Sequence, residues 1–161
     1  MVERRRIVIV GIGNTLRGDD GAGVAVVQGL QARGCARATL IDAGTAPENY
    51  LGAIARLQPD EVILIDAAAM GAAPGTTRRL AVADARWTSL STHAASLQLC
   101  VTFLRAETQA DIQLVGIQPG TRALGAALSA DVAAAVAALV KEFGADDAAT
   151  DSGAGAGKSP A

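Results

Sequence analysis

Three residues that could bind a divalent metal stand in separate segments of the chain. Asp20 lies in a glycine-rich segment after the first apolar run, Asp66 directly follows the apolar residues 62–65, and His93 is the only histidine. An imidazole with two carboxylates suits a divalent transition metal that keeps positions open for substrate, and imidazole favours Zn, Cu, Fe or Ni over Mg and Ca. The residue types therefore predict a metal-binding catalytic site at Asp20, Asp66 and His93.

Each of the three residues also has an ordinary structural interpretation. Asp20 could cap a helix that begins at Gly21, because Asp is a favoured N-cap residue. Asp66 could bond neighbouring backbone N–H groups at the end of a strand. His93 could be a surface or capping residue, which is the commoner role of a lone histidine. The residues alone leave these alternatives open.

The glycine-rich segment 11–23 does not fit a phosphate-binding loop. Leu16 takes the place of the third glycine of a dinucleotide fingerprint, and no Gly-Lys-Ser/Thr follows. Asp19 and Asp20 would also repel a phosphate at the start of the next helix. The sequence contains neither Gly-x-Ser-x-Gly nor His-Glu-x-x-His, which excludes the usual serine hydrolase elbow and the helical zinc protease motif.

The elements that must position these residues alternate along the chain. Short apolar runs predict strands at 6–10, 38–42, 61–66, 77–82 and 112–117, and helical spacing predicts helices at 24–33, 47–57, 93–105 and 129–143, the last one capped by Ser129. This alternation predicts an α/β fold, a three-layer αβα arrangement with a mostly parallel, twisted sheet and helices on both faces. Ligands of such sheets bind beyond the carboxyl ends of the strands, which is where Asp20 and Asp66 are expected.

Length and composition narrow the class of protein. The chain has 161 residues, a net charge of −2 and only 2% aromatic residues, which disfavours nucleic-acid binding. Its two cysteines, Cys35 and Cys100, form no paired motif, and no apolar stretch approaches the length of a membrane span. We expect a cytoplasmic monomer with one domain at 1–144 and a disordered tail at 145–161, without nucleic-acid or membrane partners.

Several motifs occur in an order that resembles the nickel–iron hydrogenase maturation endopeptidases. They are Gly11-Ile12-Gly13-Asn14-Thr15-Leu16-Arg17-Gly18-Asp19-Asp20-Gly21-Ala22-Gly23, Asp42-x-Gly44-x-Ala46-Pro47-Glu48-Asn49, Ile65-Asp66-Ala67, Met70-Gly71 with Pro74-Gly75, Ser91-Thr92-His93 and Gly116-Ile117-Gln118-Pro119. The second and last motifs resemble the branch that processes the formate-hydrogenlyase type of hydrogenase. The Ala67-Ala68-Ala69 stretch is less polar than is usual in the family, and the Gly/Ala/Ser tail is not part of the family core.

The resemblance implies a five-stranded sheet and an activity. The activity is removal of a short C-terminal extension from the precursor of a hydrogenase large subunit, once nickel is loaded. Asp20, Asp66 and His93 match the family's metal-contacting positions, and the nickel is presented by the precursor rather than stored. Asp19 is then expected to support the loop and helix start, and Asp42 to shape the cleft. Two alternatives need the same three residues: a hydrolase of this fold with a stored metal, and a non-catalytic chaperone that checks nickel loading.

Overall fold

A five-stranded sheet forms the centre of the computed structural model, which describes residues 3–81 and 90–145. The spatial order is β2-β1-β3-β5-β4, and only β4 runs antiparallel to its neighbour. The strands are β1 (Ile7–Ile12), β2 (Ala38–Gly44), β3 (Glu61–Ala67), β4 (Thr77–Ala81) and β5 (Asp111–Ile117). The predicted α/β fold with a mostly parallel sheet is confirmed.

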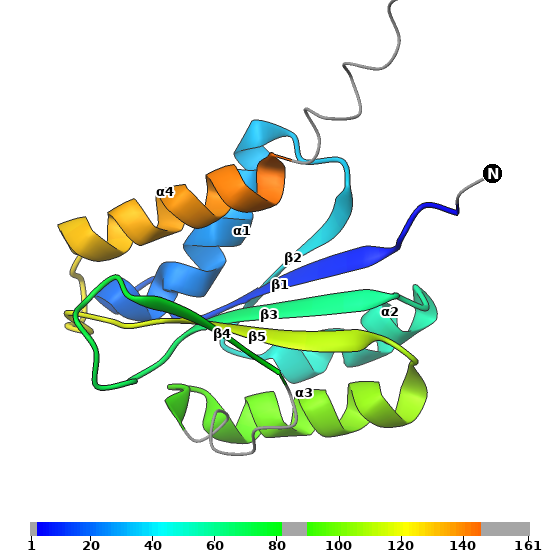
Figure 1. Ribbon diagram of the computed structural model, residues 1–161. Coiled ribbons are helices and arrows are strands. Elements are labelled where there is room, and N and C mark those ends of the chain that lie inside the picture. The colour runs from blue at the N-terminus through cyan, green and yellow to red at the C-terminus, as the bar shows by residue number, and fades with distance from the viewer. Residues whose placement is uncertain (1–2, 82–89, 146–161) are drawn as a thin grey trace, which may run out of the picture.

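Helices cover both faces of the sheet, as predicted (Figure 1). One face carries α1 (Ala22–Arg33) and α4 (Ala130–Gly144), and the other carries α2 (Leu51–Arg56) and α3 (Ala94–Glu107). Two short 3₁₀ segments, η1 (Gly18–Gly21) and η2 (Pro47–Tyr50), lead into α1 and α2. The sheet is therefore the middle layer of three.

The strand sequences are apolar at almost every position because both faces of the sheet are covered. In β1, Val8 and Val10 pack into the core beneath α2 and α3, whereas Ile9 packs into the core beneath α1 and α4. All seven residues of β3 are buried, which places the strongest strand of the sequence at the centre of the sheet. Cys100 lies in the first of these two cores.

Three details differ from the sequence-based expectations. The helix predicted at 47–57 is divided into η2 and the short α2. Ser129 occupies the position before α4 but makes no capping bond, because its hydroxyl donates instead to Asp19 Oδ2 at 2.8 Å. Val82, the expected end of the fourth strand, and residues 146–161 of the expected tail lie outside the described residues.

The start of α1 packs very closely on the sheet at Gly23. A Cβ atom at this position would stand 2.2 Å from the carbonyl oxygen of Ile65 and 2.5 Å from that of Ile12. These carbonyls belong to β3, the strand that contains Asp66, and to β1, the strand that precedes Asp20. Glycine is therefore required for α1 to sit at this depth over the two central strands.

Gly23→Ala is expected to lower the free energy of unfolding by about 2–3 kcal/mol, since the added methyl group must push α1 away from the sheet. Urea unfolding followed by circular dichroism measures the change. Gly52→Ala is the matched control, because its Cβ would meet only Arg56 Nη1 at 3.5 Å and alanine favours the helix. Equal midpoints for the two variants would contradict this account of Gly23.

Candidate active site

A cavity of about 430 Å³ opens at the carboxyl edge of the sheet. The strand order reverses between β1 and β3, since the chain runs from β1 to the outer strand β2 and returns to β3 on the other side. This is the place where α/β sheets bind ligands. The cavity is lined by Asn14, Arg17, Asp20, Thr45, Thr92, His93 and Arg122.

Asp20 is held at this cavity by the loop that follows β1. Its side chain is largely buried, and its Oδ2 atom accepts a hydrogen bond from the Asn14 N–H at 3.2 Å. The loop doubles back at Gly13, whose φ of 150° and close approach to the Asp20 carbonyl leave no room for a side chain. The alternative that Asp20 caps the following helix is wrong, because Gly21 precedes α1 and no side chain caps it.

Asp66 lies near the end of β3, where it is 4% exposed. Its Oδ1 atom accepts a hydrogen bond from the Ala67 N–H at 2.8 Å, and its Oδ2 atom accepts one from the Ser91 hydroxyl. The Ser91 hydroxyl oxygen in turn accepts the backbone N–H of His93 at 2.9 Å. Ser91 therefore fixes His93 relative to Asp66.

The imidazole of His93 lies between the two carboxylates. Its Nδ1 atom is 3.3 Å from Asp66 Oδ2, and its Nε2 atom is 3.9 Å from Asp20 Oδ2. His93 and Asp20 line the cavity, whereas Asp66 lies behind the imidazole. Such a carboxylate behind a histidine fixes the ring and leaves its other nitrogen for a ligand or a proton.

The three predicted residues are thus brought together, though not around one point. Among residues 3–81 and 90–145, no group of three His, Cys, Asp or Glu side chains is arranged to hold a metal ion. For all three to reach one ion, the imidazole would have to turn out from between the carboxylates. Binding of one metal by all three residues stays a prediction.

The electrostatics of Asp66 and His93 favour a proton shared between the carboxylate and the imidazole. Burial raises the pKa of Asp66, although hydrogen bonds from His93 and Ser91 oppose this. The hydrogen bond to Asp66 raises the pKa of His93, against the opposing effect of burial. The site can therefore hold a proton at Nδ1, between ring and carboxylate, while Nε2 faces Asp20.

Asp19 has a different role from its neighbour Asp20. Its carboxylate is fully buried and accepts hydrogen bonds from the backbone N–H groups of Gly120, Thr121 and Ser129 at 2.7–2.9 Å, besides the Ser129 hydroxyl. Burial raises its pKa, but these hydrogen bonds outweigh burial and lower the pKa below its ordinary value. The expectation that Asp19 supports the loop is confirmed.

Asp42 does not line the cavity. It is exposed at the end of β2, where its carboxylate accepts the Gly44 N–H at 3.1 Å and the Gln28 side-chain amide at 3.4 Å. Asp42 therefore stabilises the turn after β2. The expected shaping of the cleft instead comes from Thr45, three residues further along the chain.

Sequence reasoning missed the polar residues that surround the predicted three. Ser91 was part of a recognised motif without a role of its own, yet it contacts both Asp66 and His93. Arg17 and Arg122 come from loops 105 positions apart in the sequence and line one cavity. The signal that could have found them is their position directly after β1 and β5, at the same edge of the sheet.

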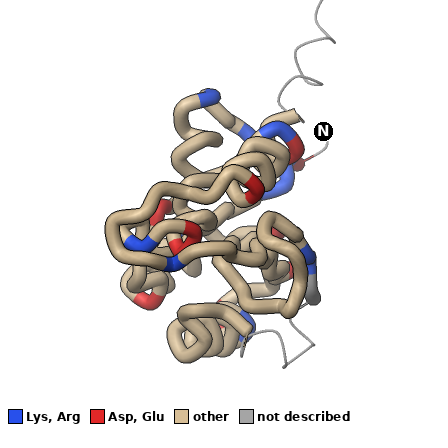
Figure 2. Tube along the Cα trace, turned by 90° about the vertical axis from the view of Figure 1, so that its left-hand side faces the viewer, with Lys and Arg blue, Asp and Glu red and all other residues tan. Residues whose placement is uncertain are grey.

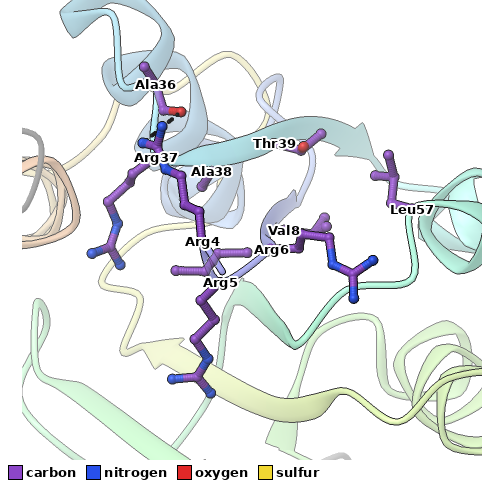
Figure 3. Close-up of a pocket in the computed structure, with 10 residues that line it drawn as sticks. Arg4, Arg5, Arg6, Val8, Ala36, Arg37, Ala38, Thr39 and Leu57 are labelled. Carbon is purple, nitrogen blue, oxygen red and sulfur yellow. Dashed lines mark hydrogen bonds between the residues drawn. The ribbon is translucent and has the colours of Figure 1, made fainter. Parts of the chain in front are cut away.

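A second cavity, of about 320 Å³, lies at the opposite edge, where β1 and β2 begin. Figure 3 shows its arginines, Arg4, Arg5, Arg6 and Arg37, pointing in different directions. Arg5 pairs with Glu61 and Arg6 with Asp60, each at 3.4 Å. The groups do not converge, and the carboxyl edge remains the candidate active site.

Charges are mixed over the surface of the described chain. Basic and acidic positions are interspersed in Figure 2 and form no continuous basic face in that view. In the described ranges, no helix is long and apolar enough to cross a membrane.

Known proteins resemble this chain in sequence and in fold. A family model described as hydrogenase maturation protease, HycI, matches residues 24–145. Hydrogenase 3 maturation protease of Escherichia coli K12 is 34% identical over 113 residues, which cover 70% of this chain and 72% of that protein.

Solved structures of hydrogenase maturation proteases also resemble this chain. The crystal structure of the NiFe hydrogenase maturation protease HycI from Thermococcus kodakarensis KOD1 has a TM-score of 0.80 at 31% identity, covering 89% of this chain and 93% of that one. The hydrogenase maturating endopeptidase HybD from E. coli has a TM-score of 0.74 at 27% identity, covering 92% and 94%. The sheet order, the cavity at its carboxyl edge and these matches lead to one conclusion: the chain belongs to the hydrogenase maturation proteases.

Proposed function

We propose that this protein is the endopeptidase that removes a short C-terminal extension from the nickel-loaded precursor of a nickel–iron hydrogenase large subunit. Family membership gives the reaction class, a peptidase acting on hydrogenase precursors. The observation that carries the assignment of the site is the cavity lined by Asp20 and His93, with Asp66 fixing the imidazole from behind.

Nickel is part of the substrate in this proposal. A carboxylate and an imidazole nitrogen are donors that suit a divalent nickel ion. Asp20 and His93 line the cavity, and the Nε2 atom of His93 lies 3.9 Å from Asp20 Oδ2, so an ion in the cavity could reach both groups. Asp66 joins them as a ligand if the imidazole turns, and otherwise orients the ring. With a precursor that lacks nickel, the Asp20 carboxylate would have only the Asn14 N–H and His93 beside it and no metal to bind, which supports cleavage that depends on loading.

Peptide hydrolysis requires a proton to leave the attacking water and another to reach the leaving amine. The nickel ion of the precursor would act as a Lewis acid on the scissile carbonyl or on the water. Asp20 or the His93–Asp66 pair would accept the proton of the water, and His93 is placed to return one to the amine. The C–N bond then breaks, giving the mature carboxyl terminus and a free peptide.

Intact-mass analysis of the nickel-loaded precursor after incubation with this protein tests the proposal. A parallel sample contains the same precursor without nickel. We expect a discrete C-terminal fragment to be lost from the loaded sample alone. Binding without cleavage would indicate a nickel-checking chaperone instead. Stoichiometric metal in the purified protein, with cleavage of nickel-free precursor, would indicate a hydrolase with a stored metal.

Ser91→Ala is expected to lower kcat/KM for this cleavage about tenfold, because Asp66 loses a hydrogen-bond donor and the His93 N–H loses its acceptor. The matched control is Thr102→Ala on α3, whose hydroxyl bonds only the Gln98 carbonyl of the preceding turn. A rate like that of the unaltered protein, with the fold intact, would remove Ser91 from the site.

We further propose that the protein works as a monomer in the cytoplasm. The sequence has only two cysteines, Cys35 and Cys100, and they form no paired motif, which suits a reducing compartment. Light scattering of the purified chain tests the oligomeric state.

A further inference from the structure

Two arginines share the cavity with Asp20 and His93. Arg17 belongs to the loop after β1 and Arg122 to the loop after β5, and both are exposed. Within the described part of the chain, neither guanidinium forms an ion pair or a side-chain hydrogen bond. Arg5, Arg6 and Arg79, by contrast, each pair with a glutamate or aspartate. The cavity therefore holds two cations whose partner is not supplied by the described residues.

The backbone that carries the two arginines is fixed. The Asp19 N–H donates to the Thr121 carbonyl at 2.8 Å, and the Gly125 N–H donates to the Leu16 carbonyl at 2.8 Å. The Asp19 carboxylate adds the bonds to the loop after β5 described above. These bonds join the two loops immediately beside Arg17 and Arg122. Both side chains thus project from anchored positions, which lowers the entropy lost when they bind a ligand.

The lining of the cavity carries charges of both signs. Asp20 and His93 are the groups suited to a metal and a scissile bond, whereas Arg17 and Arg122 are suited to an anion. Arginine offers a planar fork of N–H donors that matches a carboxylate. Each extended residue spans only about 3.3–3.6 Å, so a carboxylate within a few residues of the scissile bond would reach the same cavity.

We propose that Arg17 and Arg122 bind a carboxylate of the precursor's C-terminal extension and thereby set the direction in which the extension crosses the cavity. The inference rests on the proposed function and adds the chemical feature that the substrate must carry. The carboxylate has two possible sources, the free C-terminus and an acidic side chain within the extension.

The test is steady-state cleavage of the nickel-loaded precursor by Arg17→Gln, Arg122→Gln and the unaltered protein. We expect each substitution to raise KM about tenfold while kcat stays within about twofold, because the arginines would bind the carboxylate and take no part in the reaction at the scissile bond. Arg17→Lys and Arg122→Lys should recover part of the loss, since the charge returns without the fork. Arg105→Gln, on an exposed arginine of α3 outside the cavity, is the matched control.

Altered precursors distinguish the two sources. Amidation of the C-terminus should raise KM about tenfold for the unaltered enzyme, and much less for the arginine variants, if the terminal carboxylate is bound. If a side-chain carboxylate is bound, replacing the acidic residues of the extension by neutral ones should raise KM in the same way, and amidation should not. An unchanged KM for both arginine variants would overturn the inference, provided the unaltered protein cleaves.

Failure of the proposed function can be distinguished from failure of the inference about the arginines. In that case the unaltered protein does not cleave the loaded precursor at all. Binding of a synthetic peptide with the extension's sequence, measured by calorimetry, then still tests the arginines. Equal dissociation constants for the unaltered protein and Arg17→Gln or Arg122→Gln would overturn the inference by this second route.

Discussion

Asp20→Asn is expected to lower kcat/KM for the nickel-loaded precursor by about 10³-fold with little change in stability. The substitution removes the negative charge that faces His93 Nε2 in the cavity, and with it a metal ligand and a candidate base. The asparagine side-chain oxygen can still accept the Asn14 N–H, so the loop after β1 keeps its hydrogen bond. The time course of fragment release, followed by intact mass, gives the rate.

Asp42→Asn is the matched control for this experiment. Asp42 also follows a strand at the carboxyl edge, but it is exposed and lies outside the cavity. Its rate should stay within about threefold of the unaltered protein. Cleavage by Asp20→Asn at the rate of the control would show that Asp20 neither binds the metal nor takes part in proton transfer.

Asp19→Ala is expected to lower the free energy of unfolding by about 4 kcal/mol, and the Tm by about 10 °C. The substitution leaves the N–H groups of Gly120, Thr121 and Ser129 without their acceptor in a buried place. Thermal and urea unfolding measure the loss. Asp20→Asn serves as the neighbouring control, with a Tm within about 2 °C of the unaltered protein.

The contribution of Asp19 should also depend on pH. Because hydrogen bonds lower its pKa in the folded state below the ordinary value near 3.9, the carboxylate stabilises the fold above that value. This stabilisation is lost as the pH falls through the lowered pKa. The stability difference between the unaltered protein and Asp19→Ala should therefore be full at pH 6 and shrink below about pH 4. A difference that is constant from pH 6 to pH 3 would contradict this origin.

Much of the fold could be predicted from the sequence, because helices cover both faces of the sheet and its strands are therefore nearly continuous apolar runs. The strands were found at 6–10 and 61–66, close to Ile7–Ile12 and Glu61–Ala67. The first strand extends two residues beyond the predicted end, through Gly11 to Ile12, because glycine does not by itself end a buried strand. The expected helix at 47–57 came out as η2 and α2, because propensity does not separate a 3₁₀ turn from an α-helical one.

The part of the candidate site that could be predicted consists of residues whose position is determined by the carboxyl edge of the sheet. That rule predicted Asp20 and Asp66 at one edge, the residue type predicted His93 with them, and the structure places the imidazole between the two carboxylates. It could not show that Asp66 lies behind the imidazole, since side-chain orientation depends on loop packing. Ser129 illustrates the same limit: its local pattern indicated a helix cap, and a bond to Asp19 took its hydroxyl instead.

The hydrogen bonds of Asp19 bear on the order in which the cleft can form during synthesis. They join residues 110 positions apart, because Ser129 supplies two of the donors. On the ribosome, Ser129 leaves the exit tunnel 110 residues after Asp19. The two loops that carry Arg17 and Arg122 cannot be joined before then. A nascent chain that has not yet reached Ser129 therefore has β1 and Asp20 but lacks the bonds that join the two loops of the cleft.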